Sequence, residues 1–315
     1  MSAYLPVDLD SALRALAVPV GTLVLAFVVT RAPRVLAARA SAWALVVLSV
    51  GAAHHVTTAQ PAGVRMLVAI GVVFFAMKAL VSVESRARDG TRLPPLRWAA
   101  FATLWPGMRP ALVARLKRDR GGAAALLTTG LAYVAFGTTL FLLAHLTWRR
   151  TASLVLPTVL ILPALSFLLH FGTFGVLAGM WRAAGADVAP LFRAPWRSES
   201  LGEFWSRRWN LAFSEMTAFA VYRPVAVRAG RNPALVAAFL FSGLLHEVAI
   251  SLPVRAGYGR PLLYFAIHGV LTQVERERGP FGRAVTLLAV VLPLPLLFHR
   301  PFLQGVIWPL LGPSR

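Results

Sequence analysis

Apolar runs of about 20 residues, separated by arginine-rich segments, dominate this 315-residue sequence. A bilayer core is crossed by about 20 apolar residues in a helix, and lipid leaves only helices and closed barrels as spanning structures. Charged residues make up 14% of the chain, whereas about 25% is usual for soluble domains. The sequence therefore predicts an all-α, polytopic transmembrane helical bundle and excludes disordered, collagen-like and water-soluble chains.

Eight runs are candidate membrane spans, and a ninth is shorter. They are Leu13–Thr30, Ala42–Thr58, Val64–Val83, Ala123–His145, Ser153–Met180, Pro233–Pro253, Leu262–Val274 and Val285–Phe298, with Phe302–Leu311 as the ninth. The run Leu262–Val274 is short enough to be tilted or re-entrant. Asp8 and Asp10 stand where a signal peptide would carry basic residues, so the first span is expected to be a signal anchor.

Positive charge is concentrated between the spans. The chain has 32 Lys and Arg against 12 Asp and Glu, a net charge of +20. The first, third and fifth loops are the most basic, which predicts that they are cytoplasmic and that the N-terminus is outside. The charge then meets lipid headgroups, and no nucleic-acid partner is expected. Zero cysteines exclude disulfides and thiol nucleophiles, and the bias to Arg and Ala favours a bacterial inner membrane.

Ionisable side chains inside the spans are few, and such groups are costly in a membrane and usually functional. They are Lys78, His54, His55, His170, His246, Glu247 and His268. The adjacent pair His246 and Glu247 is the strongest anomaly, and Ser242 lies one turn earlier on the same helical face. A neutral imidazole there is a competent general base. The competing explanation is a histidine bonded to a neighbouring helix, with Glu247 paired to an arginine.

A second anomaly is the polar stretch Phe204-Trp-Ser-Arg-Arg-Trp-Asn210. Tryptophan and arginine are typical of membrane interfaces, so an interfacial anchor explains most of this stretch. It does not explain Asn210, which stands where an apolar helix begins.

Several reaction classes fail on spacing. A serine hydrolase of the usual type needs Gly-x-Ser-x-Gly, which is missing. A zinc protease needs His-Glu-x-x-His, but the segment from His246 ends in Ile250. The soluble type of wax ester synthase uses His-His-x-x-x-Asp, and the segment from His54 has Ala59 in the last position.

The remaining motifs resemble the membrane-bound O-acyltransferase superfamily. They are Phe204–Asn210, Tyr222-Arg-Pro224, Phe241-Ser-Gly-Leu-Leu-His-Glu247, Tyr264-Phe-Ala-Ile-His-Gly269 and Glu275, with Trp105–Pro110 and Phe298–Phe302 at the flanks. Within that superfamily the chain is similar to the wax synthase branch, whose plant members join fatty acyl-CoA to long-chain alcohols. The resemblance covers residues 95–305. We therefore expect one integral membrane domain, residues 1–315, with N-terminal spans in 1–94 and an acyltransferase-like core in 95–305.

The resemblance implies roles for two residues. His246 would be the general base that takes a proton from the alcohol, and Asn210 would polarise a reacting group through its amide N–H. Direct transfer from acyl-CoA as co-substrate needs no covalent intermediate, no other cofactor and no metal. The partners would be acyl-CoA, a lipophilic alcohol and membrane lipids.

Substrate contacts are implied for a wider set. It comprises Trp205, Arg207, Arg208, Trp209, Tyr222, Arg223, Ser242, Glu247 and His268. For the three arginines, contact with CoA phosphates and contact with lipid headgroups are both open. Because neighbours on a helix point about 100° apart, no proton-transfer role is assigned to Glu247.

Three alternatives stay open at this point. The acceptor can be a sterol, a terpenoid or a polyketide hydroxyl instead of a fatty alcohol. A transporter would use Lys78, His246 and Glu247 as a proton or substrate path, although no internal repeat is visible. A non-catalytic lipid-binding or scaffold protein would need neither Asn210 nor His246.

Overall fold

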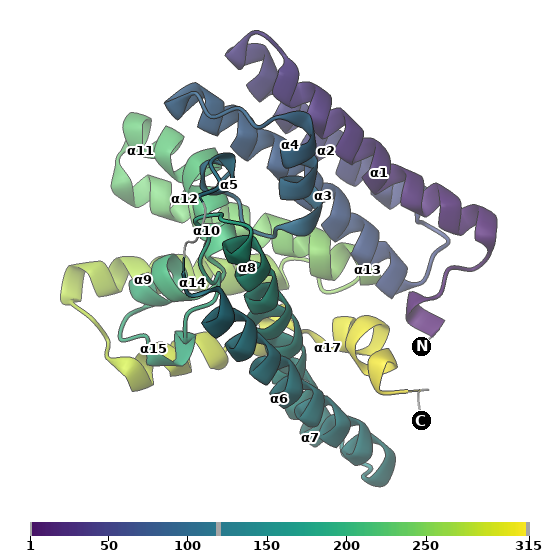
Figure 1. The fold of residues 1–315 in the computed structure, drawn as a ribbon. Coiled ribbons are helices and arrows are strands. Elements are labelled where there is room, and N and C mark those ends of the chain that lie inside the picture. The colour runs from purple at the N-terminus through teal and green to yellow at the C-terminus, as the bar shows by residue number, and fades with distance from the viewer. Residues whose placement is uncertain (1, 118–120, 313–315) are drawn as a thin grey trace.

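Three long helices, α1 (Leu9–Arg31), α2 (Val35–Val56) and α3 (Ala62–Asp89), pack side by side at the N-terminal end of the chain (Figure 1). The computed structural model describes residues 2–117 and 121–312. Helix α1 begins at a capping box, in which the Asp8 side chain accepts from the N–H of Ser11 at 2.8 Å. Helix α3 ends where Gly90 takes a left-handed φ of 72°.

Two short helices, α4 (Pro95–Leu104) and α5 (Ala111–Ala114), follow, and α4 is joined to α3 through Lys78. The Lys78 ammonium is completely buried and donates to the carbonyl oxygens of Phe101, Trp105 and Gly107 at 2.9, 2.6 and 2.7 Å. It also lies 3.7 Å from the centroid of the Phe101 ring. All three ammonium protons are thus used, and the charge holds the end of α4 against α3.

The central pair consists of α6 (Ala123–Arg150) and a span built from α7 (Val155–Leu165), η2 (Ser166–Thr173) and α8 (Phe174–Ala183). Glycines allow close approach of the two backbones. A Cβ atom at Gly130 or at Gly137 would lie 2.7 Å from a backbone nitrogen of the opposite helix. Small residues at such interfaces are the usual way for transmembrane helices to pack closely.

Short helices fill the region between the central pair and the next long helix. They are η3 (Pro195–Arg197), α9 (Leu201–Glu203), η4 (Phe204–Arg208), α10 (Leu211–Thr217), η5 (Ala218–Tyr222) and α11 (Arg223–Ala229). The buried Glu275 carboxylate fixes the start of α9, because it accepts from the N–H groups of Leu201 and Gly202 at 3.0 and 3.1 Å.

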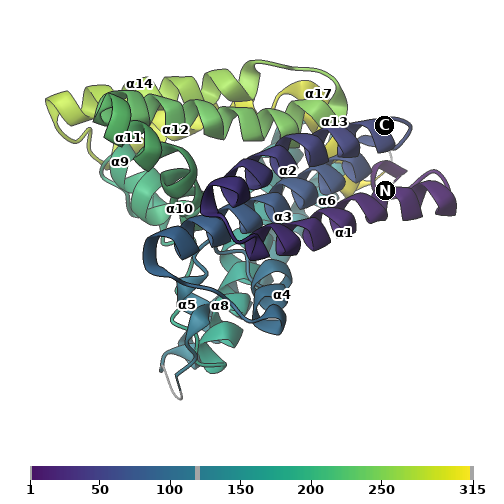
Figure 2. The same ribbon diagram turned by 90° about the horizontal axis from the view of Figure 1, so that it is seen from above.

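The following helices are α12 (Arg231–His246), continued by η6 (Glu247–Ser251) and α13 (Leu252–Val254), and α14 (Arg260–Arg278). Helices α12 and α14 lie beside each other in both views (Figures 1 and 2). They approach so closely at Gly243 that an added Cβ atom would lie 2.9 Å from the Cα of Leu262. Arg65 of α3 donates to the carbonyl of Leu252 at 2.9 Å and anchors the far end of this span.

The C-terminal helices return to the beginning of the chain. They are α15 (Arg283–Val291), α16 (Leu294–Leu297), α17 (Arg300–Phe302), η7 (Leu303–Ile307) and η8 (Trp308–Leu311). The first element of the described chain is the short helix η1 (Ser2–Tyr4). The Tyr4 hydroxyl donates to the carbonyl of Val306 at 2.9 Å, and both ends lie close together in Figures 1 and 2.

Several of these helical segments wind as π-helix. Within residues 2–117 and 121–312 they are η2, η4, η5, η6 and η7. Two coincide with the sequence anomalies, because η4 covers Phe204–Arg208 and η6 begins directly after His246. Such turns are frequent at functional sites.

The all-α fold is confirmed, since every regular element in the described residues is a helix. Six helices or composite helices there are long and apolar enough to span a membrane, and a seventh forms if Arg283–Leu297 and Arg300–Leu311, bent by 69°, count as one. The predicted eight or nine spans are somewhat more. Helix α14, the predicted span Leu262–Val274, is not among the six because its last turn carries four charges. The division at residue 95 stays a prediction.

Outward-facing apolar side chains agree with a lipid environment. On α1 they form a row of Leu13, Leu16, Val20 and Val24, each at least half exposed. An apolar face of this length in contact with water would be unfavourable, and burying it in hydrocarbon removes the cost. The chain is an integral membrane protein.

Candidate functional site

His246 is the last residue of α12, and its imidazole is held in one tautomer. The Nδ1 atom lies 2.7 Å from the carbonyl oxygen of Ser242, one turn earlier. A carbonyl oxygen only accepts, so Nδ1 carries the proton and the neutral ring keeps a lone pair on Nε2. Within the described part of the chain, Nε2 makes no hydrogen bond. The geometry therefore leaves one basic nitrogen free.

Two aromatic rings orient the imidazole. The ring centroid of Phe265, on α14, lies 4.3 Å from that of His246, and the centroid of Phe213, on α10, lies 5.5 Å away. The His246 side chain is partly exposed between them. Its position about 22 Å along α12 from Arg231, at 1.5 Å per residue, places it deep in the span. Neither phenylalanine was identified from the sequence, although Phe213 is three residues after Asn210.

Asn210 is the N-cap of α10. Its Oδ1 accepts from the N–H of Phe213 at 3.3 Å, and its φ and ψ of 43° and 62° are left-handed. Asparagine is favoured at both kinds of position, because it caps helices well and tolerates positive φ better than most residues. This role explains the residue that an interfacial anchor left unexplained. The Nδ2 group makes no hydrogen bond among the described residues and is available as a donor.

The structure brings the two predicted catalytic residues into one neighbourhood. Phe213 is the link, because its N–H is bonded to Asn210 and its ring packs on His246. Ser214 adds a second link, because its hydroxyl donates to the carbonyl oxygen of Trp205 at 2.5 Å. The motif Phe204–Asn210 is thereby tied to α10, and α10 packs against α12.

Glu247 does not join this group. Its Oε1 accepts from the N–H of Leu262 in the first turn of α14 at 3.0 Å. A carboxylate there interacts favourably with the helix dipole and satisfies an otherwise unpaired N–H. Its Oε2 is buried and has no hydrogen-bond partner in the described chain.

His268 and Trp205 form a buried polar pair. His268 Nδ1 donates to the carbonyl oxygen of Tyr264 at 2.8 Å, and the two ring centroids of His268 and Trp205 are 5.2 Å apart at 85°. His268 Nε2 and Trp205 Nε1 are both buried without a hydrogen-bond partner in the described residues. One is an acceptor and the other a donor, the combination that a hydroxyl group satisfies.

A continuous set of aromatic contacts leads from His246 to an apolar groove. Successive ring pairs are His246–Phe265, Phe265–Trp205, Trp205–Phe204, Phe204–Trp209, Trp209–Phe192, Phe192–Phe171 and Phe171–Trp196, with centroids 4.3 to 5.7 Å apart. Trp196 lines the groove together with Ala132, Tyr133, Phe136 and Phe167. The groove measures about 400 Å³ and is open to its surroundings. Trp209 therefore packs in the middle of the aromatic set.

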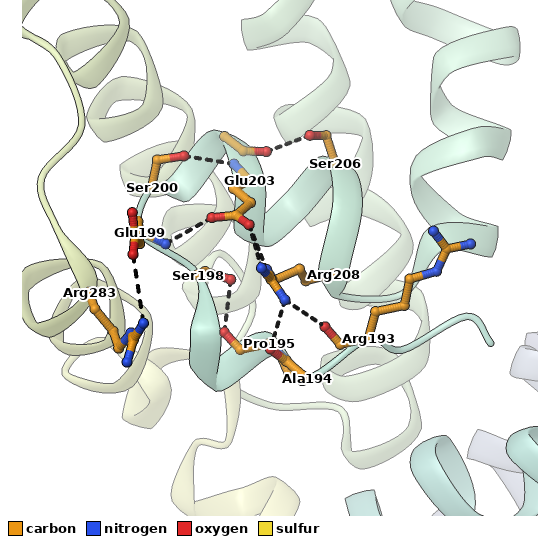
Figure 3. Close-up of polar contacts among 11 residues, drawn as sticks. Arg193, Ala194, Pro195, Ser198, Glu199, Ser200, Glu203, Ser206, Arg208 and Arg283 are labelled. Carbon is orange, nitrogen blue, oxygen red and sulfur yellow. Dashed lines mark hydrogen bonds and ion pairs between the residues drawn. The ribbon is translucent and has the colours of Figure 1, made fainter.

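Arg208 is engaged within the protein. Its guanidinium pairs with the Glu203 carboxylate at 2.7 Å and donates to the carbonyls of Arg193 and Ala194 (Figure 3). The N–H of Glu199 and the Arg208 guanidinium hold the pKa of Glu203 below its usual value. In Figure 3 the Arg193 side chain extends away from this network.

The other predicted binding residues are more open. Arg207 is exposed and makes no hydrogen bond among the described residues, and Tyr222 is partly exposed at the end of η5. The Arg223 guanidinium lies 4.6 Å from the centroid of the Phe219 ring, and that of Arg88 lies 4.5 Å from the same ring. Residues 2–117 and 121–312 contain no group of three His, Asp or Glu side chains that could hold a metal.

Comparisons with known proteins point to one family. Residues 188–267 match the Membrane bound O-acyl transferase family. The long-chain-alcohol O-fatty-acyltransferase of Simmondsia chinensis is 37% identical over 100 residues, which cover 29% of this chain and 28% of that protein. Probable long-chain-alcohol O-fatty-acyltransferases 7 and 9 of Arabidopsis thaliana are 38% and 31% identical, over 31% and 42% of this chain and 32% and 45% of their own length.

These matches span less than half of each relative. The family match over residues 188–267 includes the segment that contains Asn210, His246 and their aromatic neighbours. The site thus lies in the part of the chain for which the resemblance to the membrane-bound O-acyltransferase family, wax synthase-like branch, is confirmed.

Proposed function

We propose that this protein transfers an acyl group from acyl-CoA to the hydroxyl of a lipophilic alcohol, as an integral membrane O-acyltransferase. The observation that carries the proposal is the free Nε2 of His246, held deep in a span by the bond from Nδ1 to Ser242. The names of the relatives, which are long-chain-alcohol O-fatty-acyltransferases, support the reaction class.

In the proposed step His246 Nε2 removes the proton from the alcohol hydroxyl. The alcohol oxygen attacks the thioester carbonyl, an ester bond forms, and the carbon–sulfur bond breaks. The CoA sulfur leaves as thiolate and takes up the proton from the imidazolium, which restores the neutral base. The bond from Nδ1 to the Ser242 carbonyl oxygen would persist throughout and become stronger while the ring is charged.

Asn210 would assist through its amide nitrogen. Its oxygen is used to cap α10, so the Nδ2 protons are the part of the side chain left for a reacting group. A donor aimed at the thioester oxygen stabilises the negative charge that develops there. The left-handed backbone and the cap hold this side chain in place before substrate binds.

The buried pair Trp205 and His268 is suited to a hydroxyl-bearing acceptor. His268 Nε2 is an acceptor and Trp205 Nε1 a donor, both without partners in the described residues, and an alcohol hydroxyl that reached them would satisfy both. Phe265 touches both Trp205 and His246. The aromatic groove at Trp196 is suited to an aliphatic or isoprenoid chain, because its lining is apolar. Exclusion of water along this path would limit thioester hydrolysis.

The transporter alternative is weakened by Lys78. A proton carrier must release and take up protons, but the three Lys78 protons are all donated to backbone carbonyls in a fully buried site. Glu247 is engaged at the start of α14 instead of facing His246. The predicted location in a bacterial inner membrane is part of this proposal and is tested by membrane fractionation of the native cells.

The decisive experiment uses the full chain, purified in a non-ionic detergent, with acyl-CoAs of several lengths and a panel of fatty alcohols, sterols and terpenols. We expect free CoA to appear only when an alcohol is added, with an equal amount of ester detected by mass spectrometry. Release of CoA that does not depend on alcohol, or passage of alcohol across proteoliposomes without ester formation, would contradict the proposal.

A further inference from the structure

A narrow notch lies where the ends of α1 and α3 meet the segment before α4, on the predicted cytoplasmic side. Its lining includes Thr30, Arg31, Arg86, Thr91, Arg92 and Leu93. The notch holds about 10 Å³, which is room for one water-sized group, and it is open at its mouth. Three of its lining residues are arginines.

Two of the arginines are fixed by backbone carbonyls. Arg86 Nη1 donates to the oxygens of Thr30 and Ala32 at 3.0 and 2.8 Å, and Arg31 Nη2 donates to that of Leu93 at 2.8 Å. The remaining buried guanidinium nitrogens are not satisfied. Arg31 Nε, Arg86 Nε and Arg86 Nη2 have no hydrogen-bond partner in the described residues.

The carboxylates nearby are already paired. Glu84 forms an ion pair with Arg39 at 2.6 Å, and Asp89 forms one with Arg88 at 2.7 Å. Asp89 also accepts from the N–H of Thr91 at 3.0 Å. Among the described residues, no ion pair connects a carboxylate to Arg31, Arg86 or the exposed Arg92. The notch therefore combines three positive charges with unpaired donors.

Water alone does not complete this arrangement. A single water accepts at most two hydrogen bonds and leaves the charge of three neighbouring guanidiniums unbalanced. An anionic oxygen accepts several N–H bonds and neutralises charge at the same time. Guanidinium groups match the geometry of phosphate and carboxylate oxygens, and the carboxylates of Glu84 and Asp89 are already paired with other arginines.

We propose that this notch binds a phosphate group, with one anionic oxygen inserted between Arg31 and Arg86 and the rest of the group at the mouth beside Arg92. The phosphate can belong to a lipid headgroup or be free in solution, because the notch opens at the ends of two membrane-spanning helices. This site is separate from His246 on α12 and does not depend on the proposed acyltransferase activity.

The test measures the thermal unfolding temperature of the full chain in a non-ionic detergent, at constant ionic strength. One arm titrates inorganic phosphate against chloride, and the other adds phosphatidylglycerol against uncharged diacylglycerol. We expect at least one arm to raise the unfolding temperature of the unmodified protein. Stabilisation by phosphatidylglycerol alone identifies a headgroup site, and stabilisation by inorganic phosphate identifies a site for free phosphate.

Variants assign the effect to the notch. Arg86→Gln is expected to weaken the apparent affinity about tenfold, the effect of one charge-assisted hydrogen bond. Arg92→Gln is expected to weaken it about threefold, by charge alone. Because Arg92 makes no hydrogen bond in the described chain, Arg92→Gln leaves the bonds from Arg31 and Arg86 to backbone carbonyls intact. This second variant therefore still tests the proposal if Arg86→Gln fails to fold.

Arg34→Gln is the matched control. Arg34 is exposed in the connection between α1 and α2, three residues after Arg31, and it does not line the notch, so its removal lowers the net charge equally without altering the notch. The control should keep the full stabilisation. The same response in all variants, or no response of the unmodified protein to either anion, would overturn the proposal.

Discussion

Lys78 and His246 are both ionisable side chains inside long apolar helices, and their surroundings differ. Around Lys78, three carbonyl oxygens and an aromatic ring use every proton of the ammonium. Around His246, one nitrogen is bonded to Ser242, the ring packs against two aromatic rings, and the other nitrogen makes no hydrogen bond in the described residues. The difference separates a structural group from a chemical one, because only a group with a free donor or acceptor can act on a substrate.

The largest effect is expected from His246→Ala. Loss of a general base lowers kcat by about 10²- to 10⁴-fold, and we expect the ester yield to fall by about 10³-fold. The change also removes the bond to Ser242 and the ring contacts with Phe213 and Phe265, so the unfolding temperature is measured beside the rate and the rate is expressed per folded protein. Rates are measured as CoA release with the best alcohol from the panel.

His145→Ala is the control for this variant. His145 is another partly buried histidine in a span, and its Nδ1 bonds the carbonyl oxygen of Leu311 at 2.9 Å. It should keep its activity. Equal losses in both variants would mean that any imidazole of this kind is needed for the fold, and the contrast with Lys78 would fail.

Lys78→Met should show the opposite pattern. The substitution keeps the apolar length but leaves the carbonyls of Phe101, Trp105 and Gly107 without their donor in a fully buried site. We expect destabilisation by about 3 kcal/mol or more, seen as a lower unfolding temperature in detergent. The folded fraction should retain its specific activity. A folded, inactive Lys78→Met protein would show that Lys78 takes part in function.

Substitutions of Asn210 can separate its two roles, the helix cap made by Oδ1 and the hydrogen-bond donor Nδ2. Asn210→Asp keeps an acceptor for the N–H of Phe213 and tolerates positive φ, but it removes the Nδ2 protons. We expect near-normal stability and a fall in kcat of at least about tenfold. Asn210→Gly keeps the backbone conformation and loses the whole side chain. If both variants stay active, Asn210 is a cap only.

The smallest effect concerns Glu203. Because the N–H of Glu199 and the Arg208 guanidinium lower the pKa of this carboxyl, the ionised form stabilises the fold above its ordinary value of 4.5. That contribution is lost as the pH falls below about 4.5 toward the lowered value. Glu203→Gln should therefore lower the free energy of unfolding by about 1 kcal/mol at pH 7. It should also weaken the fall of that free energy as the pH drops below about 4.5. The same fall in the variant as in the unmodified chain would show that the pair contributes nothing.

The long apolar helices could be predicted from apolar length, because lipid requires that length of every spanning helix, but the eight or nine predicted spans exceed the six or seven that qualify in the described residues. The run Leu262–Val274 was harder to classify as a span, since the charged residues of α14 begin directly after it. The position of Asn210 before an apolar helix is a cap signal that the sequence contains and that we interpreted as a catalytic feature only. Its catalytic role stays a prediction.

Other parts of the site could not have been predicted from one sequence. Lys78 was recognised as an anomaly, but its partners lie 23 to 29 residues away in a short helix and the loop after it. Phe265 reaches His246 only because α12 and α14 pack closely at Gly243. The arginines at the ends of α1 and α3 were assigned to topology, and their shared notch depends on the packing of those helices.

The π-helical turn η6 divides the span of His246 into two α-helical segments. The extra residue of this turn determines the angle about the helix axis between two residues. One is His246, and the other is Leu252, whose carbonyl oxygen is bonded by Arg65. Removal of one residue from Glu247–Ser251 would restore a uniform α-helix and rotate everything after it by about 100° relative to His246. A single insertion or deletion in this turn can therefore change the direction in which His246 points relative to Leu252, which stays bound to Arg65. A series of substitutions would not be needed.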